Sequence, residues 1–301
     1  MSRIKIVLTA ASLLAVSTAE VRSQPASPIE DRPGAFESLK AYPLLASIDR
    51  GGTASPPIPF PARESWGGLS GEQLFQELHK AMMPGRTAPP GYKQAKAYMY
   101  SKADNVICGG GPGIITFYSE VCVRGSSDNG SDYPEQGDQN GDGVVDGFVN
   151  AEHIWPQSYF NSALPMVSDL HQLASTLYTP NSRRGNVRFA EVSNAAYSTS
   201  CGSKLGKEGF EPCDPEKGNV ARAMLYFVAR YYDKNIRQGM NYNDFWTSRV
   251  PLLLKWNRQD PPDANELRRN DLVQAFQGNR NPFIDDPSLA DRIGEAVLEA
   301  H

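Results

Sequence analysis

Four cysteines, gathered in two clusters, place the tightest constraint on how this chain can fold. They are Cys108, Cys122, Cys201 and Cys213. The sequence alone permits three pairings, and the clustering favours two local disulfides, Cys108 with Cys122 and Cys201 with Cys213. A zinc site is the weaker alternative, because no two of them have the two-residue spacing of a zinc knuckle. Disulfides of this kind are expected in a chain exported to an oxidising compartment.

The N-terminus supports export. Two basic residues in the first five are followed by an apolar run of 11 residues, Ile6 to Val16, and then by small residues suited to cleavage. This pattern predicts a signal peptide over 1–23, with a buried N-terminal helix as the alternative. A Pro- and Ser-rich linker is predicted over 24–62 and a folded domain over 63–301. No later run approaches the ~20 apolar residues of a membrane span, so the mature protein is expected to be secreted, extracellular or periplasmic, without a membrane segment.

The net charge of −4 over 301 residues argues against a broadly cationic nucleic-acid binder. The charge is unevenly distributed, however. Residues 101–180 carry a net charge of −8, whereas 181–280 carry +5. Some cations of this basic segment are expected to line a phosphate-binding groove. The candidates are Arg183, Arg184, Arg188, Arg222, Arg230, Lys255, Arg258, Arg268, Arg269 and Arg280. The last three of these are expected to pair with acidic residues instead.

Hydrophobic periodicity predicts many helices around a small β element, which is an α+β fold. Helices are expected over 74–82, 92–103, 217–232, 244–258, 265–277 and 288–300. β-branched and aromatic residues predict strands over 114–118 and 144–150. Residues 124–143 are expected to form a polar, acidic loop.

The stretch from Asn150 to Ser158 places a carboxylate and an imidazole side by side, in Glu152 and His153. In the middle of a strand the two would point to opposite faces, whereas at a strand end both can serve one site. Glu152 offers an oxygen ligand for a hard cation. His153 is able to take a proton from water, because an imidazole has a pKa of about 6.5. The alternative is a surface glutamate beside a partly buried histidine.

Two later stretches complete a pattern. Residues 168–173 carry Asp169 and His171, and residues 180–186 carry Asn181, Arg183, Arg184 and Asn186. A strand bearing a histidine, followed by a helix bearing an amide and guanidinium groups, is typical of a ββα-metal arrangement. One helical face then holds a metal ligand and phosphate-binding arginines together.

With these motifs the chain resembles the endonuclease I family of secreted or periplasmic ββα-metal (His-Me finger) nucleases. The resemblance covers about residues 65–290. Its matching stretches occur in family order at 150–158, 168–173, 181–186, 217–224 with Tyr231, 256–260 with Glu266, 268–270 and 277–285.

The resemblance implies a role for each matching residue. His153 stands where the family has its general base, and Glu152 and Asn181 stand where it has the ligands of a divalent metal, usually Mg²⁺, with Mn²⁺ or Ca²⁺ as alternatives. It further implies hydrolysis of DNA, and of RNA as well, without sequence preference and with 5′-phosphate products. The protein is expected to act as a monomer.

The chain departs from the family pattern in two places. The run after Asp169-Leu170-His171 lacks the family's second histidine and Phe-Pro, and residues 161–167 contain no arginine. The task of stabilising the transition state therefore falls to Arg184 or Arg183, or is not performed. Asp169, His171, Asn186 and Arg183 are expected to support the site or contact substrate, with plain core packing as the alternative for His171.

An acidic loop upstream of Glu152 resembles the start of a calcium-binding loop. Asp138, Asn140, Asp142 and Asp146 stand at positions 1, 3, 5 and 9, and Gly143 takes the turn position. The glutamate at position 12 is missing, so a structural Ca²⁺ site competes with a solvated turn. Two other functions stay open at this point: a non-catalytic extracellular calcium-binding or adhesion module, and a phosphodiesterase for small esters.

Overall fold

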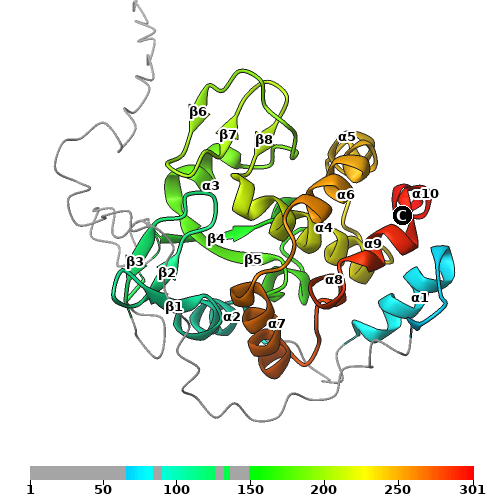
Figure 1. Cartoon of the computed structure of the whole chain (residues 1–301), viewed down its shortest axis with the longest axis horizontal. Coiled ribbons are helices and arrows are strands. Elements are labelled where there is room, and N and C mark those ends of the chain that lie inside the picture. Colours follow the sequence, from blue (N-terminus) through cyan, green and yellow to red (C-terminus); the bar gives the residue numbers. More distant parts are fainter. Residues whose placement is uncertain (1–65, 84–89, 126–131, 134, 136–148) are drawn as a thin grey trace, which may run out of the picture.

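The computed structural model describes residues 66–83, 90–125, 132–133, 135 and 149–301. The predicted signal peptide, the predicted linker and all four proposed calcium ligands lie outside these residues. The described part combines many helices with three small sheets, which confirms the α+β class (Figure 1). Among its helices, none is both long enough and apolar enough to cross a membrane.

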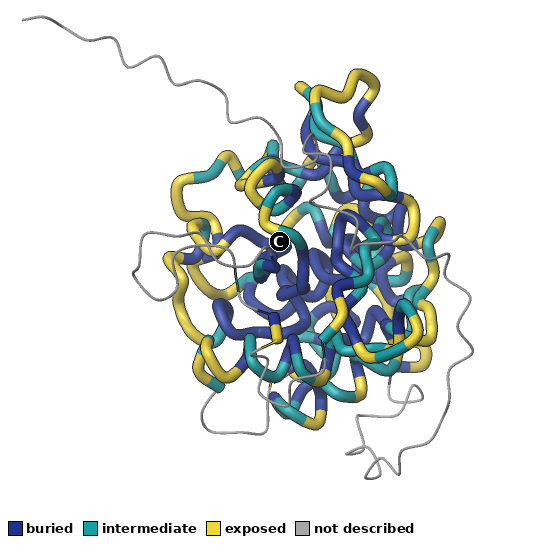
Figure 2. Tube along the Cα trace, turned by 90° about the vertical axis from the view of Figure 1, so that its left-hand side faces the viewer, coloured by how far each residue is buried: buried dark blue, intermediate teal, exposed yellow. Residues whose placement is uncertain are grey.

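Helix α4 (Lys217–Tyr231) runs through the middle of the helical region. Nearly all of its side chains are buried, and such a helix must be covered on every side. Its neighbours are α1 (Gly71–Ala81), α6 (Val250–Gln259) and α8 (Pro282–Asp285), with α9 (Ser288–Ile293), α10 (Glu295–Ala300) and the short α5 (Tyr242–Phe245) outside them. Figure 2 shows the buried segments gathered in this interior. The resulting core supports the β hairpin that carries the motif residues.

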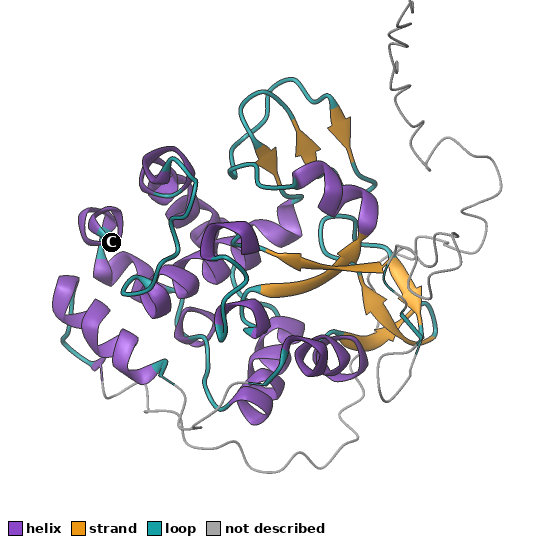
Figure 3. Ribbon diagram, turned by 180° about the vertical axis from the view of Figure 1, so that it is seen from behind, coloured by secondary structure: helices purple, strands orange, loops and turns teal. Residues whose placement is uncertain are grey.

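That hairpin consists of β4 (Val149–His153) and β5 (Leu173–Leu177), antiparallel from Val149↔Leu177 to His153↔Leu173. Helix α3 (Tyr178–Arg184) begins at the residue after β5. Figure 3 shows the hairpin between the helices and a second antiparallel sheet, β1 (Asn105–Cys108), β2 (Gly111–Ile115) and β3 (Cys122–Arg124). A bridge between Phe117 and Thr176 attaches this second sheet to β5. The sequence thus folds into a strand, a strand and a helix in direct succession.

The remaining elements surround the hairpin. Helix α2 (Tyr92–Tyr98) continues into a π-helical turn (Met99–Ala103), and α7 (Ala264–Gln277) lies close to it (Figure 1). Three short strands, β6 (Tyr197–Ser198), β7 (Lys204–Leu205) and β8 (Phe210–Glu211), form a third sheet beyond α3. Short 3₁₀ turns fill the links at Gln157–Phe160, Met166–Ser168, Asp214–Glu216 and Thr247–Arg249.

Both predicted disulfides are present. Cys108–Cys122 joins β1 to β3, with Cα atoms 5.9 Å apart, and Cys201–Cys213 closes the loop that contains β7 and β8, with Cα atoms 5.8 Å apart. Among the described residues no cysteine is free. The local pairing expected from the two clusters is therefore confirmed, and the zinc alternative is wrong.

Several predicted elements differ at their ends. The strand expected over 114–118 stops at Ile115, because the chain turns through Tyr118 with φ +70°. The final helix is split at Gly294, whose φ of +86° is readily adopted only by glycine. The helix expected over 244–258 is broken before Val250, and Pro251 then occupies the first turn of α6, where a missing N–H costs little. Part of the strand expected over 144–150 lies outside the described residues, and the described strand runs on to His153.

Candidate active site

Glu152 and His153 are the last two residues of β4, and both side chains are buried. Because neighbours on a strand point to opposite faces, the two side chains meet different elements. Glu152 faces Arg184 of α3 and Tyr118 of the turn after β2. His153 faces Val167 and the ring of Tyr92. The pair therefore sits at a strand end, but the two side chains still point to opposite sides of that end.

Glu152 is a buried carboxylate whose charge is only partly neutralised. The Tyr118 hydroxyl donates to Oε1 at 2.7 Å, and Arg184 Nη1 lies 3.1 Å from the same oxygen. In the part of the chain that the structure describes, no side chain donates to Oε2. Burial raises the pKa of Glu152, and Arg184 and Tyr118 offset this only in part. An additional cation beside Oε2 would therefore stabilise the ionised form.

Asn181 presents a second oxygen from α3. Its amide nitrogen donates to the side chain of Asn150 and to the carbonyl of Ala151 at 3.3 Å. Both contacts are on β4, next to Glu152. The nitrogen is thus occupied and the amide oxygen, Oδ1, accepts no hydrogen bond from the described residues. α3 in this way holds a neutral oxygen ligand beside a charged one.

These two oxygens fit a divalent cation of the Mg²⁺ type. Within the described ranges no three His, Cys, Asp or Glu side chains are grouped as a complete metal cage. Mg²⁺ usually keeps several waters and uses one or two carboxylates together with substrate phosphate oxygens. The pair Glu152 and Asn181 suits that mode, and it does not suit the thiolate and imidazole preference of a structural zinc site.

Arg184 was expected to contact the transition state, and the structure gives it a different position. The residue is completely buried. Its guanidinium donates to the carbonyls of His153 at 3.0 Å and Ile154, and it lies 4.7 Å above the ring of Phe189. Together with its contact to Glu152, these bonds fix the end of β4 against α3. The geometry favours a positioning role over direct contact with a phosphate.

His153 is held as a neutral base. Its Nε2 lies 3.0 Å from the carbonyl oxygen of Val167, which can only accept, so Nε2 carries the proton and Nδ1 carries the lone pair. Burial lowers the pKa of His153 to about 4; the bond to Val167 opposes this, and the positive charges of Lys96 and Arg184 add to it. The imidazole is therefore unprotonated at neutral pH, with Nδ1 able to accept a proton.

Asp169 and His171 form a separate buried network behind the hairpin. Asp169 accepts five hydrogen bonds, from the backbone of His171 and from the side chains of Tyr226, Arg230, Tyr231 and Gln277. His171 Nε2 lies 3.0 Å from the carbonyl oxygen of Asn279. These contacts join the β4–β5 connection to α4 and to the end of α7. The two residues thus anchor the β4–β5 connection to these helices, and neither contacts Glu152 or His153 directly.

Arg183 lies near the end of α3 and Asn186 follows that helix, and both are exposed. The Asn186 amide donates to the Ser158 hydroxyl at 3.0 Å, and Tyr159 donates to the Asn186 carbonyl. This ties the chain after α3 to the 3₁₀ turn after β4. Arg183 lies 5.6 Å from the ring centroid of Tyr197 in β6. Of the two, Arg183 is the exposed positive charge that a polyanion could contact.

The basic segment 181–280 contributes fewer phosphate contacts than its charge suggests. Arg184, Arg222 and Arg230 are buried against Glu152, Glu266 and Asp169. Arg269 pairs with Asp104, Arg280 pairs with Asp271 and Asp285, and Arg268 donates to backbone carbonyls. Arg188, Lys255 and Arg258 pair with Asp244, Glu191 and Asp291. The expectation of internal pairing for the last three arginines is thus confirmed for Arg269 and Arg280, whereas Arg268 bonds to backbone carbonyls.

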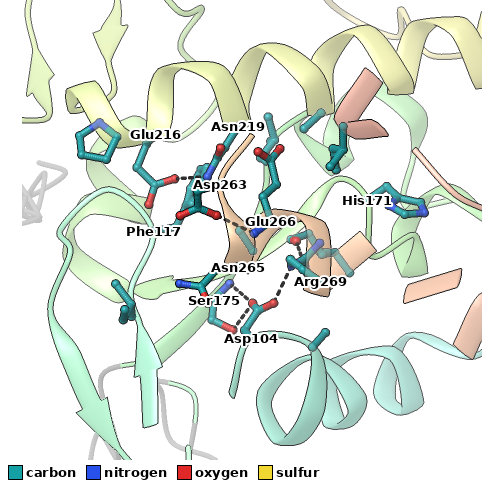
Figure 4. Close-up of a pocket in the computed structure, with 18 of the residues that line it drawn as sticks. Asp104, Phe117, His171, Ser175, Glu216, Asn219, Asp263, Asn265, Glu266 and Arg269 are labelled. Carbon is teal, nitrogen blue, oxygen red and sulfur yellow. Dashed lines mark hydrogen bonds and ion pairs between the residues drawn. The ribbon is translucent and has the colours of Figure 1, made fainter. Parts of the chain in front are cut away.

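A cavity of about 200 Å³ lies on another side of the hairpin, between β5 and the first turns of α4 and α7. Figure 4 shows the carboxylates of Glu216, Asp263 and Glu266 turned toward it. Burial and the nearby Glu120 hold the pKa of Glu216 well above its usual range. Glu266 is paired with Arg222, and Asp104 with Arg269, at the same cavity. Neither Glu152, His153 nor Asn181 lines it, so it is distinct from the candidate active site.

Sequence reasoning missed three contributors to the site. Tyr118 reaches Glu152 from 34 residues earlier in the chain, Asn150 orients Asn181, and Lys96 of α2 acts on His153. Asn150 lay inside the motif that was singled out, and its position two residues before Glu152 places it on the same strand face. For Tyr118 and Lys96 the sequence carries no local signal, because both approach through tertiary packing.

The sequence is similar to those of several extracellular nucleases over part of its length. An extracellular ribonuclease of Bacillus amyloliquefaciens is 36% identical over 165 residues, which are 52% of this chain and 56% of the relative. An extracellular ribonuclease of Bacillus subtilis (strain 168) is 35% identical over 164 residues, 51% and 56% of the two chains. An extracellular deoxyribonuclease of Aeromonas hydrophila is 28% identical over 124 residues, 40% and 50%. The chain spans about half the length of these curated relatives.

The family model of endonuclease I matches a much longer stretch, residues 70–288. This stretch contains the hairpin, α3, the buried network around Asp169 and the helices that enclose it. Because the match covers well over half of the sequence, the protein belongs to the endonuclease I family.

Proposed function

We propose that this protein is an exported, metal-dependent endonuclease that hydrolyses phosphodiester bonds. The observation that carries the proposal is the end of β4. There a neutral imidazole with a free Nδ1 adjoins a buried, partly neutralised carboxylate, and Asn181 holds an amide oxygen beside it. The order β4, β5, α3 agrees with the ββα-metal arrangement expected from the motifs.

The two faces of the strand end suit an in-line displacement, in which the nucleophile and the leaving group lie on opposite sides of phosphorus. His153 Nδ1 takes the proton of the attacking water, while the bond from Nε2 to Val167 keeps the ring in the required tautomer. Glu152 and Asn181 would hold a divalent cation, which supplies charge stabilisation at the phosphate and the leaving oxygen. Arg184 keeps the end of β4 and α3 in register, and Tyr118 fixes the Glu152 carboxylate.

The proposed substrates are RNA and DNA, without sequence preference. Two relatives at 36% and 35% identity are named ribonucleases, and relatives at 28% and 29% are named deoxyribonucleases. A site built around a phosphate reads the backbone and not the bases, so it accepts both polymers. The products carry 5′-phosphates when the 3′ oxygen leaves. We further propose that residues 1–23 direct export and that the mature protein acts as a monomer.

His153→Ala tests the proposed function most directly. We expect the mature wild-type protein to degrade plasmid and a long RNA in Mg²⁺, and activity to fall by about 10²–10⁴-fold in the variant, the usual contribution of a general base. Chelation with EDTA should abolish wild-type activity. A folded, disulfide-intact wild-type sample that leaves RNA, single-stranded DNA and plasmid intact in Mg²⁺, Mn²⁺ and Ca²⁺ would refute the proposal.

A structural Ca²⁺ site at Asp138, Asn140, Asp142 and Asp146 remains a separate proposal from the sequence. These residues lie outside the described ranges, and the loop leads directly to β4. Titration calorimetry on metal-free protein should detect Ca²⁺ binding that Asp142→Ala removes and that Glu152→Gln retains. The absence of binding at millimolar Ca²⁺ would contradict this site without affecting the proposal for His153.

A further inference from the structure

Two cations act on the imidazole of His153, and they differ in what they are free to bind. Arg184 is one of them, but it is completely buried and its two terminal nitrogens bond to the carbonyls of His153 and Ile154. Lys96 of α2 is the other, and its side chain is 23% exposed. Only the second of these can meet a ligand without rearrangement of the strand end.

Lys96 lies at the side of the catalytic imidazole. Helix α2 packs against the 3₁₀ turn Met166–Ser168, which supplies the carbonyl that holds His153. Within α2, the Tyr92 ring lies 5.5 Å from the ring of His153, and the Lys96 ammonium lies 4.7 Å from the Tyr92 ring. Lysine, tyrosine and histidine therefore follow one another along the side of the active site.

Glu135 binds the Lys96 ammonium through one of its N–H donors. Lys96 Nζ donates to Glu135 Oε2 at 2.6 Å, and Tyr100 donates to the other oxygen of the same carboxylate at 2.8 Å. An ammonium has three donors. Apart from its contact with the Tyr92 ring, Lys96 makes no second polar bond among the described residues, so two donors remain for another acceptor. Glu135 in turn keeps the bond from Tyr100 if the ammonium shifts.

From this arrangement we infer that Lys96 binds a nonbridging oxygen of a nucleic-acid phosphate held beside His153, and that Glu135 positions the ammonium for it. The inference rests on the proposed nuclease function and adds a substrate-contacting residue from α2. It explains how the site obtains an accessible positive charge although residues 161–167 contain no arginine and Arg184 is buried. A lysine acts here as a point charge on a flexible stem.

The test measures binding of a fluorescein-labelled single-stranded oligonucleotide by anisotropy, with Mg²⁺, in a His153→Ala background that does not cleave. We expect Lys96→Met to weaken binding about ten-fold, since a charge-assisted hydrogen bond is lost. The slope of log Kd against log salt should decrease by about 0.7, the value for one phosphate contact on a single strand. Lys96→Arg should recover most of the affinity. Lys93→Met, on the exposed side of the same short helix, is the matched control and should bind like the parent.

Glu135→Gln separates substrate binding from a structural role. If Lys96 contacts phosphate, Glu135→Gln keeps the ammonium and loses only the carboxylate that positions it, so binding weakens less than in Lys96→Met. If the ion pair only braces α2, Glu135→Gln and Lys96→Met weaken binding to the same extent, and the inference is wrong. Equal affinity and an equal salt slope in Lys96→Met and the parent would also overturn it.

The same variants with His153 restored distinguish this inference from the proposed function. A wild-type protein that cleaves, together with a Lys96→Met variant that cleaves and binds equally well, removes the role of Lys96 alone. A wild-type protein that fails to cleave removes the proposed function, and the binding series still decides whether Lys96 contacts phosphate. Should Lys96→Met fail to fold, Lys96→Gln carries the decision, because it also removes the charge and keeps a long polar side chain that can bond to Glu135.

Discussion

Asp169 and Glu152 are both buried carboxylates paired with a buried arginine, yet the protein treats their charges differently. Burial alone would raise the pKa of Asp169, but Arg230 and the bonds from Gln277 and Tyr231 outweigh it and hold the pKa below its usual range. At Glu152 burial prevails over Arg184 and Tyr118, and the pKa is raised. One carboxylate is fully satisfied by the protein, and the other is not.

The opposite pKa shifts of Asp169 and Glu152 indicate different roles for the two regions around them. A buried charge with five donors, as at Asp169, rigidifies the structure around it. A buried carboxylate whose neighbours offset its burial only in part, as at Glu152, retains the capacity to bind a cation, at a cost to stability. The network around Asp169 thus serves the fold, and the end of β4 serves the chemistry. The predictions below test this division, beginning with the largest effect.

Asp169→Asn should destabilise the protein by about 3–5 kcal/mol, because it leaves the buried Arg230 without its counter-charge. The free energy of unfolding from urea titration measures this. Asp233→Asn is the control: that carboxylate pairs with Lys234 at the surface, and its loss should cost less than about 0.5 kcal/mol. Equal costs at the two positions would contradict a structural role for the Asp169 network.

Glu152→Gln should have the reverse profile. The amide preserves shape and can still accept from Tyr118, and Arg184 keeps its bonds to the carbonyls of His153 and Ile154, so the free energy of unfolding should change by less than in Asp169→Asn. Nuclease activity should fall by about a hundred-fold or more, since the ionised ligand that holds the metal contributes several kcal/mol to the transition state. If instead activity persists while stability collapses, Glu152 belongs with Asp169 and the comparison fails.

Mg²⁺ should stabilise the wild-type protein against heat, because binding satisfies Glu152 in the folded state only. At a concentration one hundred times the Kd the expected gain is about 2.7 kcal/mol. Glu152→Gln should abolish the shift in Tm, and Asp233→Asn should keep it. A shift that survives Glu152→Gln would place the responsible ion elsewhere, with the proposed calcium loop as the first candidate.

His171→Gln should make the protein less sensitive to acid. Burial lowers the pKa of His171 to about 4, below the value of about 6.5 for the unfolded chain. The unfolded state therefore binds more protons between these values, and stability falls as the pH decreases from about 6.5 to about 4. The variant lacks this titrating group, so the slope of its free energy of unfolding against pH should decrease by at most about 1.4 kcal/mol per pH unit. An unchanged slope would show that His171 does not titrate in this way.

Local sequence signals predicted most of the fold. Helices were expected where α1, α4 and α7 lie, of which α1 is amphipathic, and the clustered cysteines gave both disulfides. These features depend on residues close together in the chain, where spacing determines geometry. Element ends were less accurate, as at Tyr118 and Gly294, because a turn is selected by the packing around it as well as by its own residues.

The candidate site was predictable only in part. Glu152, His153 and Asn181 were named from their motifs, and the hairpin and α3 bring these segments together. The contributions of Tyr118 and Lys96 were not predictable, since each approaches from a distant segment. For the same reason the partners of the arginines in segment 181–280 were not predictable. An arginine counts as one positive charge in the sequence whether its guanidinium faces solvent or is buried against a carboxylate.

The sequence by itself determined the chemical groups of the site, the family motifs and the two covalent loops. Tertiary structure alone decided which charges are neutralised. Arg184, Arg222 and Arg230 are withdrawn from any substrate by burial, while Lys96 is partly exposed and its polar bond among the described residues is to Glu135. The strength of a side chain's charge interactions, and its availability to a ligand, depend on the local dielectric and on the partners within a few ångströms. Both are established only when distant segments pack together.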